Sequence, residues 1–205
     1  MGILVKPARK LMTVDEFFDF VHRPENDARC FDLVRGEVIE VSRPNRPHGM
    51  ICANGMFILM NYARKTTRFY VTGDTGVVLE RRPDTVRGPD IAVWDDVQRF
   101  EDLPKKWGNT QPRVAVEVLS PNDRPDYVHN KITDYLNNNV DMVWVLDPPT
   151  RTLTVHRPGV EPVILTEKDW LTGNDVLPGF RCKVAEFFRK PQPPARKHRT
   201  KRKKK

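Results

Sequence analysis

The sequence predicts a mixed α/β domain whose sheet is covered on both faces. Residues 90–94 and 114–119 are apolar at almost every position, which is typical of strands buried on both sides. Residues 126–138 instead carry apolar side chains at helical spacing. The chain has 205 residues, a length that suits one domain or one domain with a tail.

The N-terminal half is predicted to form a helix, a hairpin and a second helix. Thr13 stands three residues before Glu16, and this capping pattern starts a short helix. Apolar and polar residues alternate over 31–41 on either side of an Arg-Gly pair, which predicts a β-hairpin. Residues 48–64 have no two-residue period and no proline, which favours a helix.

The remaining elements are predicted mostly as short strands. Two of them surround a Gly-Asp-Thr turn, and two more follow the helix at 126–138 and are joined by a Pro-Pro-Thr turn. A final apolar cluster closes the domain. These segments are residues 68–72, 76–79, 142–146, 152–156 and 177–188.

The net charge of +8 comes from the C-terminal end. Residues 189–205 contain ten Lys or Arg and no acid, so the rest of the chain has 25 basic and 27 acidic residues and a net charge of −2. Three prolines precede most of these basic residues. We therefore expect an N-terminal extension over 1–11, a domain over 12–188 and an extended, mobile basic tail over 189–205.

Several classes of protein are excluded by what the sequence lacks. No apolar run approaches the roughly 18 residues of a membrane span, and residues 1–10 lack the apolar centre of a secretory signal. We expect a cytosolic protein without a membrane partner. Cys30, Cys52 and Cys182 form no C-x-x-C pair and the histidines form no H-x-x-x-H pair, so we expect buried thiols rather than a disulfide framework or a zinc site.

Two carboxylates stand where ordinary strand residues are expected. Glu117 lies within the apolar run 114–119, and a buried carboxylate requires a compensating partner. Asp90 follows a proline at the head of the run 90–94. If both strands belong to one sheet, the two carboxylates form an oxygen site for a hard cation such as Mg²⁺. The alternatives are an arginine partner for Glu117 and a solvated turn for Asp90.

Lys131 is placed so that it can reach Glu117. It lies 14 residues later, at the edge of the buried stripe of the helix predicted over 126–138. From that edge its stem can run along the sheet and bring the ammonium to Glu117. The alternative is a surface lysine that only covers apolar neighbours.

Six segments in this order resemble the Uma-two family of restriction endonuclease-like proteins, which belongs to the PD-(D/E)XK nuclease superfamily. The resemblance spans about residues 12–188. The segments are residues 31–38 (FDLVRGEV), 89–93 (PDIAV), 116–121 (VEVLSP), 131–136 (KITDYL), 143–148 (VWVLDP) and 177–180 (LPGF).

The resemblance implies a restriction endonuclease-like α/β/α sandwich around a mixed β-sheet, preceded by the N-terminal helix and β-hairpin. It also implies that Asp90 and Glu117 hold Mg²⁺ or Mn²⁺. Leu119 stands where the superfamily has a lysine, and the resemblance assigns that ammonium to Lys131.

Three further residues are candidates for the site. Glu37 and His48 resemble the N-terminal motif positions of the family, where one residue completes the metal shell or positions water. Glu37 can equally be a solvated hairpin residue. Asp74, between Gly73 and Thr75, is either a site residue or a turn residue.

These expectations together predict a Mg²⁺-dependent endonuclease that cleaves nucleic acid. DNA is favoured over RNA as the substrate, and the sequence leaves both open. The alternatives are a nuclease-fold protein that binds nucleic acid without cleaving it, and a module that binds a small molecule or a protein. The sequence leaves open whether the protein forms a homodimer. The basic tail is expected to contact phosphates through Arg196, Lys197, Arg199, Lys201, Arg202, Lys203, Lys204 and Lys205.

Overall fold

The structure is a computed structural model that describes residues 11–190. Its α-helices are α1 (Val14–Val21), α2 (Arg46–Thr66) and α3 (Pro125–Asn137), and its short 3₁₀ helices are η1 (Pro24–Asn26), η2 (Phe100–Asp102) and η3 (Val184–Glu186). Its strands are β1 (Cys30–Val34), β2 (Glu37–Val41), β3 (Tyr70–Gly73), β4 (Val77–Glu80), β5 (Thr85–Arg87), β6 (Ile91–Trp94), β7 (Val114–Val118), β8 (Met142–Asp147), β9 (Thr152–Arg157), β10 (Val160–Thr166), β11 (Trp170–Thr172) and β12 (Arg181–Lys183).

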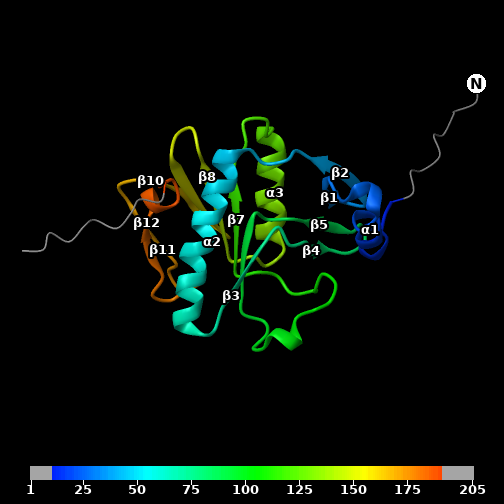
Figure 1. Ribbon diagram of the computed structural model, residues 1–205, viewed down its shortest axis with the longest axis horizontal. Helices are drawn as coiled ribbons and strands as arrows, with labels where there is room; N and C mark the ends of the chain where they lie inside the picture. Colours follow the sequence, from blue (N-terminus) through cyan, green and yellow to red (C-terminus); the bar gives the residue numbers. More distant parts are fainter. Residues whose placement is uncertain (1–10, 191–205) are drawn as a thin grey trace, which may run out of the picture.

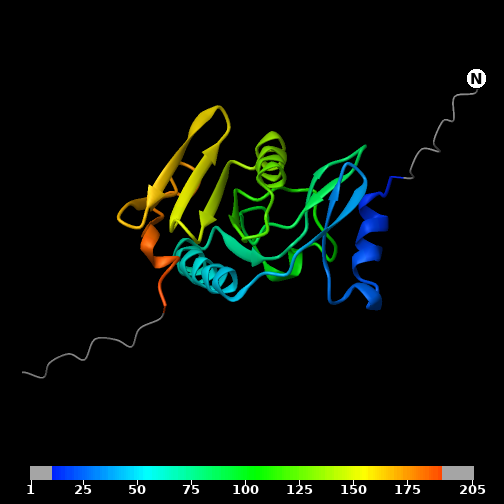
Figure 2. The ribbon, with the colours of Figure 1, turned by 90° about the horizontal axis from the view of Figure 1, so that it is seen from above.

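A six-stranded mixed sheet forms the centre of the molecule, in the order β10-β9-β8-β7-β6-β3. The pair β7 and β8 is parallel and the other pairs are antiparallel. A parallel pair requires a crossover, and α3 supplies it. Figures 1 and 2 show α2 and α3 on opposite sides of this sheet, so the predicted α/β/α sandwich is confirmed.

The two faces of the sheet pack against different helices. Ile91 and Val116 share one apolar cluster with Ile51 of α2. Ala92 and its neighbours on the other face pack with Tyr135 of α3. Every residue of β6 and β7 is buried, as expected for strands that are covered on both faces.

A second, four-stranded sheet has the order β2-β1-β5-β4 and packs against α1. Its predicted hairpin is present, because β1 pairs with β2 through a two-residue turn in which Arg35 has φ 48° and Gly36 has φ 80°. Both left-handed values are those that a type I′ turn requires. The capping box predicted at the start of α1 is also present, between Thr13 and Glu16.

The helix expected over 48–64 is confirmed as α2, which begins two residues earlier because Asn45 caps it. Gly55 lies inside this helix although glycine lowers helix propensity, and the structure explains the residue. A Cβ at this position would lie 2.7 Å from Cδ1 of Ile91 in β6, so the helix can approach the sheet only with a glycine here. None of the helices within residues 11–190 is long and apolar enough to cross a membrane.

Arg87 at the end of β5 is almost completely buried and connects the small sheet to α3. Its Nη1 donates to Asp32 of β1 at 3.1 Å, while its Nε and Nη2 donate to Asp134 of α3 at 2.9 and 2.6 Å. Tyr127 donates a short hydrogen bond to Asp32 and lies beneath the guanidinium. This network fixes where α3 lies relative to β5, and the site described below depends on that placement.

Candidate active site

Asp90 and Glu117 lie on neighbouring strands. In the antiparallel pair β6 and β7, Ile91 is opposite Val116, and extending this register by one residue places Asp90 opposite Glu117. Residues directly opposite each other in such a pair point to the same face and are close. Both residues line one cavity of about 570 Å³, and Lys131 lines it too.

Glu117 is buried and has two donors of its own. Its Oε2 accepts from Nζ of Lys131 at 2.8 Å, and its Oε1 accepts from the hydroxyl of Tyr135 at 2.8 Å. Burial raises the pKa of Glu117 to about 7, although Lys131 and Tyr135 both act to lower it. The partner of this carboxylate is therefore a lysine, not an arginine.

Lys131 has a second acceptor, because its Nζ also donates to the backbone carbonyl of Gly88 at 3.0 Å. Burial alone would lower the pKa of this lysine, but the charges of Glu117, Asp32 and Asp90 outweigh burial and leave the pKa raised. The ammonium is thus charged in the folded protein. It ties α3 both to β7 and to the segment that leads into Asp90.

Asp90 is held from two sides. Its Oδ2 accepts from the backbone N–H of Val118 at 2.7 Å, and its Oδ1 lies 3.2 Å from Nε2 of His48. Burial lowers the pKa of His48, but the hydrogen bond and the charge of Asp90 outweigh burial, so that pKa is raised. The structure therefore brings His48, a candidate from the sequence, into contact with Asp90.

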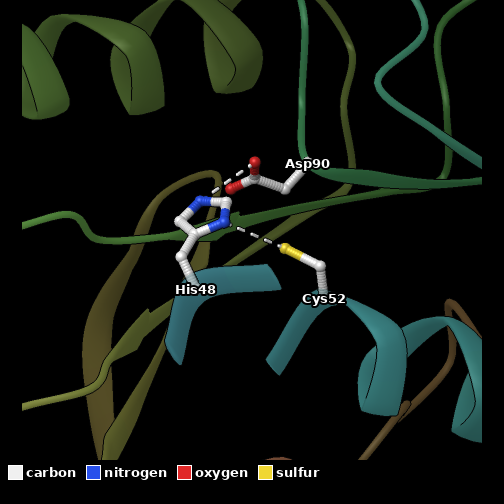
Figure 3. Close-up of side chains that lie close together, drawn as sticks. All are labelled: His48, Cys52 and Asp90. Carbon is white, nitrogen blue, oxygen red and sulfur yellow. Dashed lines mark hydrogen bonds and ion pairs between the residues drawn. The ribbon is translucent and has the colours of Figure 1, made fainter. Parts of the chain in front are cut away.

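Cys52 also belongs to this group, and it is half-buried at the cavity rather than a buried thiol. Its Sγ lies 3.4 Å from Nδ1 of His48, one helical turn away on α2 (Figure 3). The cavity lining includes Cys52. His48, Cys52 and Asp90 form the one group within residues 11–190 whose three ligand atoms lie within 4.8 Å of one another. The signal that points to Cys52 is its spacing H-x-x-x-C from His48, which places an imidazole and a thiol on one face of a helix.

The two remaining candidates lie in different places. Asp74 has a left-handed backbone with φ 50° and is a turn residue, yet it lines the cavity and its backbone N–H donates to the carbonyl of Asp90 at 3.4 Å. Glu37 is exposed at the start of β2 and does not line the cavity. Asp32, which the sequence analysis did not select, is buried and does line it.

The donor atoms at Asp90 and Glu117 suit a hard cation. Each carboxylate oxygen that accepts one hydrogen bond retains a further lone pair, and both residues line the cavity. Mg²⁺ prefers one or two carboxylates and keeps several waters, for which the cavity has room. The residues therefore fit Mg²⁺, the ion expected from the sequence.

Glu117 is expected to make the free energy of unfolding fall as pH rises. Its pKa is about 7 in the folded protein and 4.5 ordinarily, so between these values the folded state holds a proton that the unfolded state releases. Its stabilising contribution is complete below the lower value and is lost as pH rises through the upper one, by an amount on the order of 1–3 kcal/mol.

Urea denaturation of wild type and Glu117→Gln at about pH 5 and about pH 8.5 checks this expectation. The free energy of unfolding of wild type should fall between the two pH values relative to that of the variant, because glutamine does not titrate. An identical difference at both pH values would contradict the raised pKa.

The fold agrees with comparisons to known proteins. A crystal structure of a putative nuclease belonging to DUF820 from Anabaena variabilis superposes with a TM-score of 0.70 at 19% identity, covering 86% of this chain and 97% of that one. A cryo-EM structure of a DrdV–DNA complex gives a TM-score of 0.40 at 17% identity, covers 73% of this chain and 12% of that one, and adds nothing to the fold assignment.

No curated protein matches the sequence. Residues 14–185, most of the chain, match the Uma-two family, which is described as putative restriction endonuclease. The chain belongs to the Uma-two family of putative restriction endonucleases.

Proposed function

We propose that the protein is a Mg²⁺-dependent endonuclease that hydrolyses phosphodiester bonds of nucleic acid, DNA rather than RNA. The observation that carries the proposal is the pair Asp90 and Glu117 on adjacent strands, open to one cavity, with Lys131 on Glu117. Membership of the Uma-two family supports it. A nuclease needs such a site to be wide enough for a phosphate, and the cavity volume of about 570 Å³ is sufficient.

Each residue of the site would have a separate role in phosphodiester hydrolysis. Asp90 and Glu117 would hold Mg²⁺ or Mn²⁺, which when bound polarises the phosphate and lowers the pKa of an attacking water. Lys131 favours the ionised form of Glu117 and lies close enough to the cavity to orient that water or to offset the charge that develops on the phosphate. His48 and the N–H of Val118 fix the direction of the Asp90 carboxylate.

Purified protein should nick plasmid DNA with Mg²⁺ or Mn²⁺, and Asp90→Asn and Glu117→Gln should each lower the rate by at least about a hundredfold. Asp95→Asn is the matched control, because Asp95 follows the other end of β6 and pairs there with Arg68 and Arg113. It should cleave at the wild-type rate. The same assay on RNA tests the preference for DNA.

Cleavage that survives Asp90→Asn would refute the assignment of the site. An inactive wild type that still binds nucleic acid would favour the second candidate, a nuclease-fold protein that binds without cutting. The observation in favour of this second candidate is Leu119, which stands where the superfamily has a lysine and packs partly buried against the apolar cluster beneath α3. Single-turnover cleavage distinguishes the two candidates.

The basic tail is proposed as a sequence-independent phosphate binder, and its residues 191–205 lie outside the described residues. Deleting residues 191–205, which carry eight Lys or Arg, is expected to change the free energy of unfolding by less than about 1 kcal/mol. The deletion should begin at 191 because Asn54 donates to the backbone carbonyl of Arg189 at 2.9 Å.

Affinity for DNA should fall at low salt in the deletion variant, and the slope of log K against log salt should become shallower because fewer counterions are released. Cleavage at saturating DNA should persist. An unchanged slope would contradict the role of the tail. The cytosolic location, the homodimer and the domain limits stay predictions.

A further inference from the structure

We propose that the cavity also binds a thiophilic divalent cation, Zn²⁺ above all, through His48, Cys52 and Asp90, in competition with Mg²⁺ for Asp90. The binding site itself goes beyond the proposed nuclease activity and does not rest on it. Only the competition rests on the proposed function, because it assumes that Asp90 also holds Mg²⁺.

The donor atoms of these three residues select this class of ion. A thiolate and an imidazole suit Zn²⁺ and related transition metals, whereas Mg²⁺ takes oxygen ligands. His48 and Cys52 supply the nitrogen and the sulfur, and both side chains line the cavity together with Asp90. Three protein ligands that face a cavity leave one position for water, which is the arrangement of an open zinc site.

The distances between the ligand atoms are close to those that such a site requires. Tetrahedral zinc with bonds of about 2.0–2.3 Å places its ligand atoms about 3.3–3.8 Å apart. Here His48 Nε2 lies 3.2 Å from Asp90 Oδ1, Nδ1 of the same ring lies 3.4 Å from Cys52 Sγ, and all three residues can present an atom within 4.8 Å of the others. The two short contacts use opposite ring nitrogens, so an ion bound through one nitrogen replaces the contact made there, and the remaining side chain has to turn toward the ion.

The backbone holds the three residues in place. His48 and Cys52 lie four residues apart on α2, so their side chains are neighbours on one helix face. Asp90 is fixed by the N–H of Val118 at 2.7 Å. The ion enters a negative environment, since Asp74, Glu117 and Asp123 line the same cavity, and its charge permits the thiol of Cys52 to release its proton.

Co²⁺ titration of the full-length protein, without nucleic acid, tests the proposal. A thiolate ligand gives Co²⁺ a near-ultraviolet charge-transfer band, and Zn²⁺ should displace the ion and abolish the band. Cys52→Ser should lose the band, while Cys30→Ser should keep it. Cys30 is the matched control because its thiol lines the same cavity but lies outside the group of three.

Asp90→Asn should keep the band and weaken the affinity for Co²⁺ at least about tenfold, and excess Mg²⁺ should weaken the apparent affinity in wild type. A wild type without the band, or a band that survives Cys52→Ser, overturns the site. Unchanged affinity in Asp90→Asn overturns the role of Asp90, and indifference to Mg²⁺ overturns the competition.

A measurement on wild type alone keeps the test valid if a variant fails to fold. Zn²⁺ should protect Cys52 but not Cys30 from alkylation, as read by mass spectrometry, and equal protection of both overturns the site. Neither readout needs cleavage, so the two proposals can fail separately. A protein that shows the band but does not cleave contradicts only the proposed nuclease activity, and a protein that cleaves but shows no band contradicts only the site for Zn²⁺.

Discussion

Replacing Lys131 by methionine is expected to lower the free energy of unfolding by about 3–5 kcal/mol at about pH 8, where Glu117 is ionised in wild type. The variant leaves the Glu117 carboxylate buried without a cation and leaves the carbonyl of Gly88 without its donor. At about pH 5 the loss should be smaller, because Glu117 is then protonated and needs no counter-charge. Urea denaturation at the two pH values measures it.

The double variant Lys131→Met with Glu117→Gln is the control, because it removes both charges. It should be more stable than Lys131→Met alone at about pH 8, since a buried pair costs most when only one partner is removed. A double variant no more stable than the single one would show that the two side chains do not act as a pair. Cleavage by Lys131→Met should fall, and Lys131→Arg should recover part of it by restoring the charge.

Replacing Arg87 by methionine is expected to lower the free energy of unfolding by about 3–5 kcal/mol. The guanidinium is 1% exposed and pairs with both Asp32 and Asp134, so its removal leaves two carboxylates close together without a cation. Methionine fills much of the volume, so the effect measures charge rather than a cavity. Thermal and urea denaturation report it.

Arg81→Met is the matched control for Arg87. Arg81 lies after β4, has a side chain 47% exposed and pairs with Asp84 at only 3.8 Å, so its loss should change the stability by less than about 1 kcal/mol. Similar losses in both variants would mean that the buried network does not stabilise the fold. In Arg87→Met the position of Lys131 should also become less well fixed, because Arg87 holds the helix α3 that carries Lys131.

The predictable parts of the fold are those whose residues carry their own pattern. The strands β6 and β7 are apolar at successive positions, and the capping box of α1 lies within four residues. The position of Lys131 at the edge of the stripe on α3 followed from helical geometry. Such signals are local, so no partner from elsewhere in the chain is needed to read them.

The missed elements depend on distant partners or on exposed edges. The strand β5 is three residues long, and its polar residues depend on distant partners. Thr85 accepts a hydrogen bond from the N–H of Arg35, and Arg87 pairs with Asp32 and Asp134, which lie 55 and 47 residues away from it. The strand β10 lies at the edge of the sheet and is exposed along most of its length, and Pro162 leaves it an apolar run of only three residues, Val163 to Leu165. The role of Cys52 likewise requires both the helix and Asp90 to be in place.

The contacts of α3 determine how the molecule can open. Arg87 ties this helix to the small sheet and Lys131 ties it to the carbonyl of Gly88, just before Asp90. The small sheet therefore cannot detach while the large one stays folded, since detachment would separate Arg87 from Asp134 and Lys131 from the carbonyl of Gly88 at the same time. Amide hydrogens of β5 and of α3 should exchange with solvent in a single cooperative opening, and no partly unfolded form would retain the cavity.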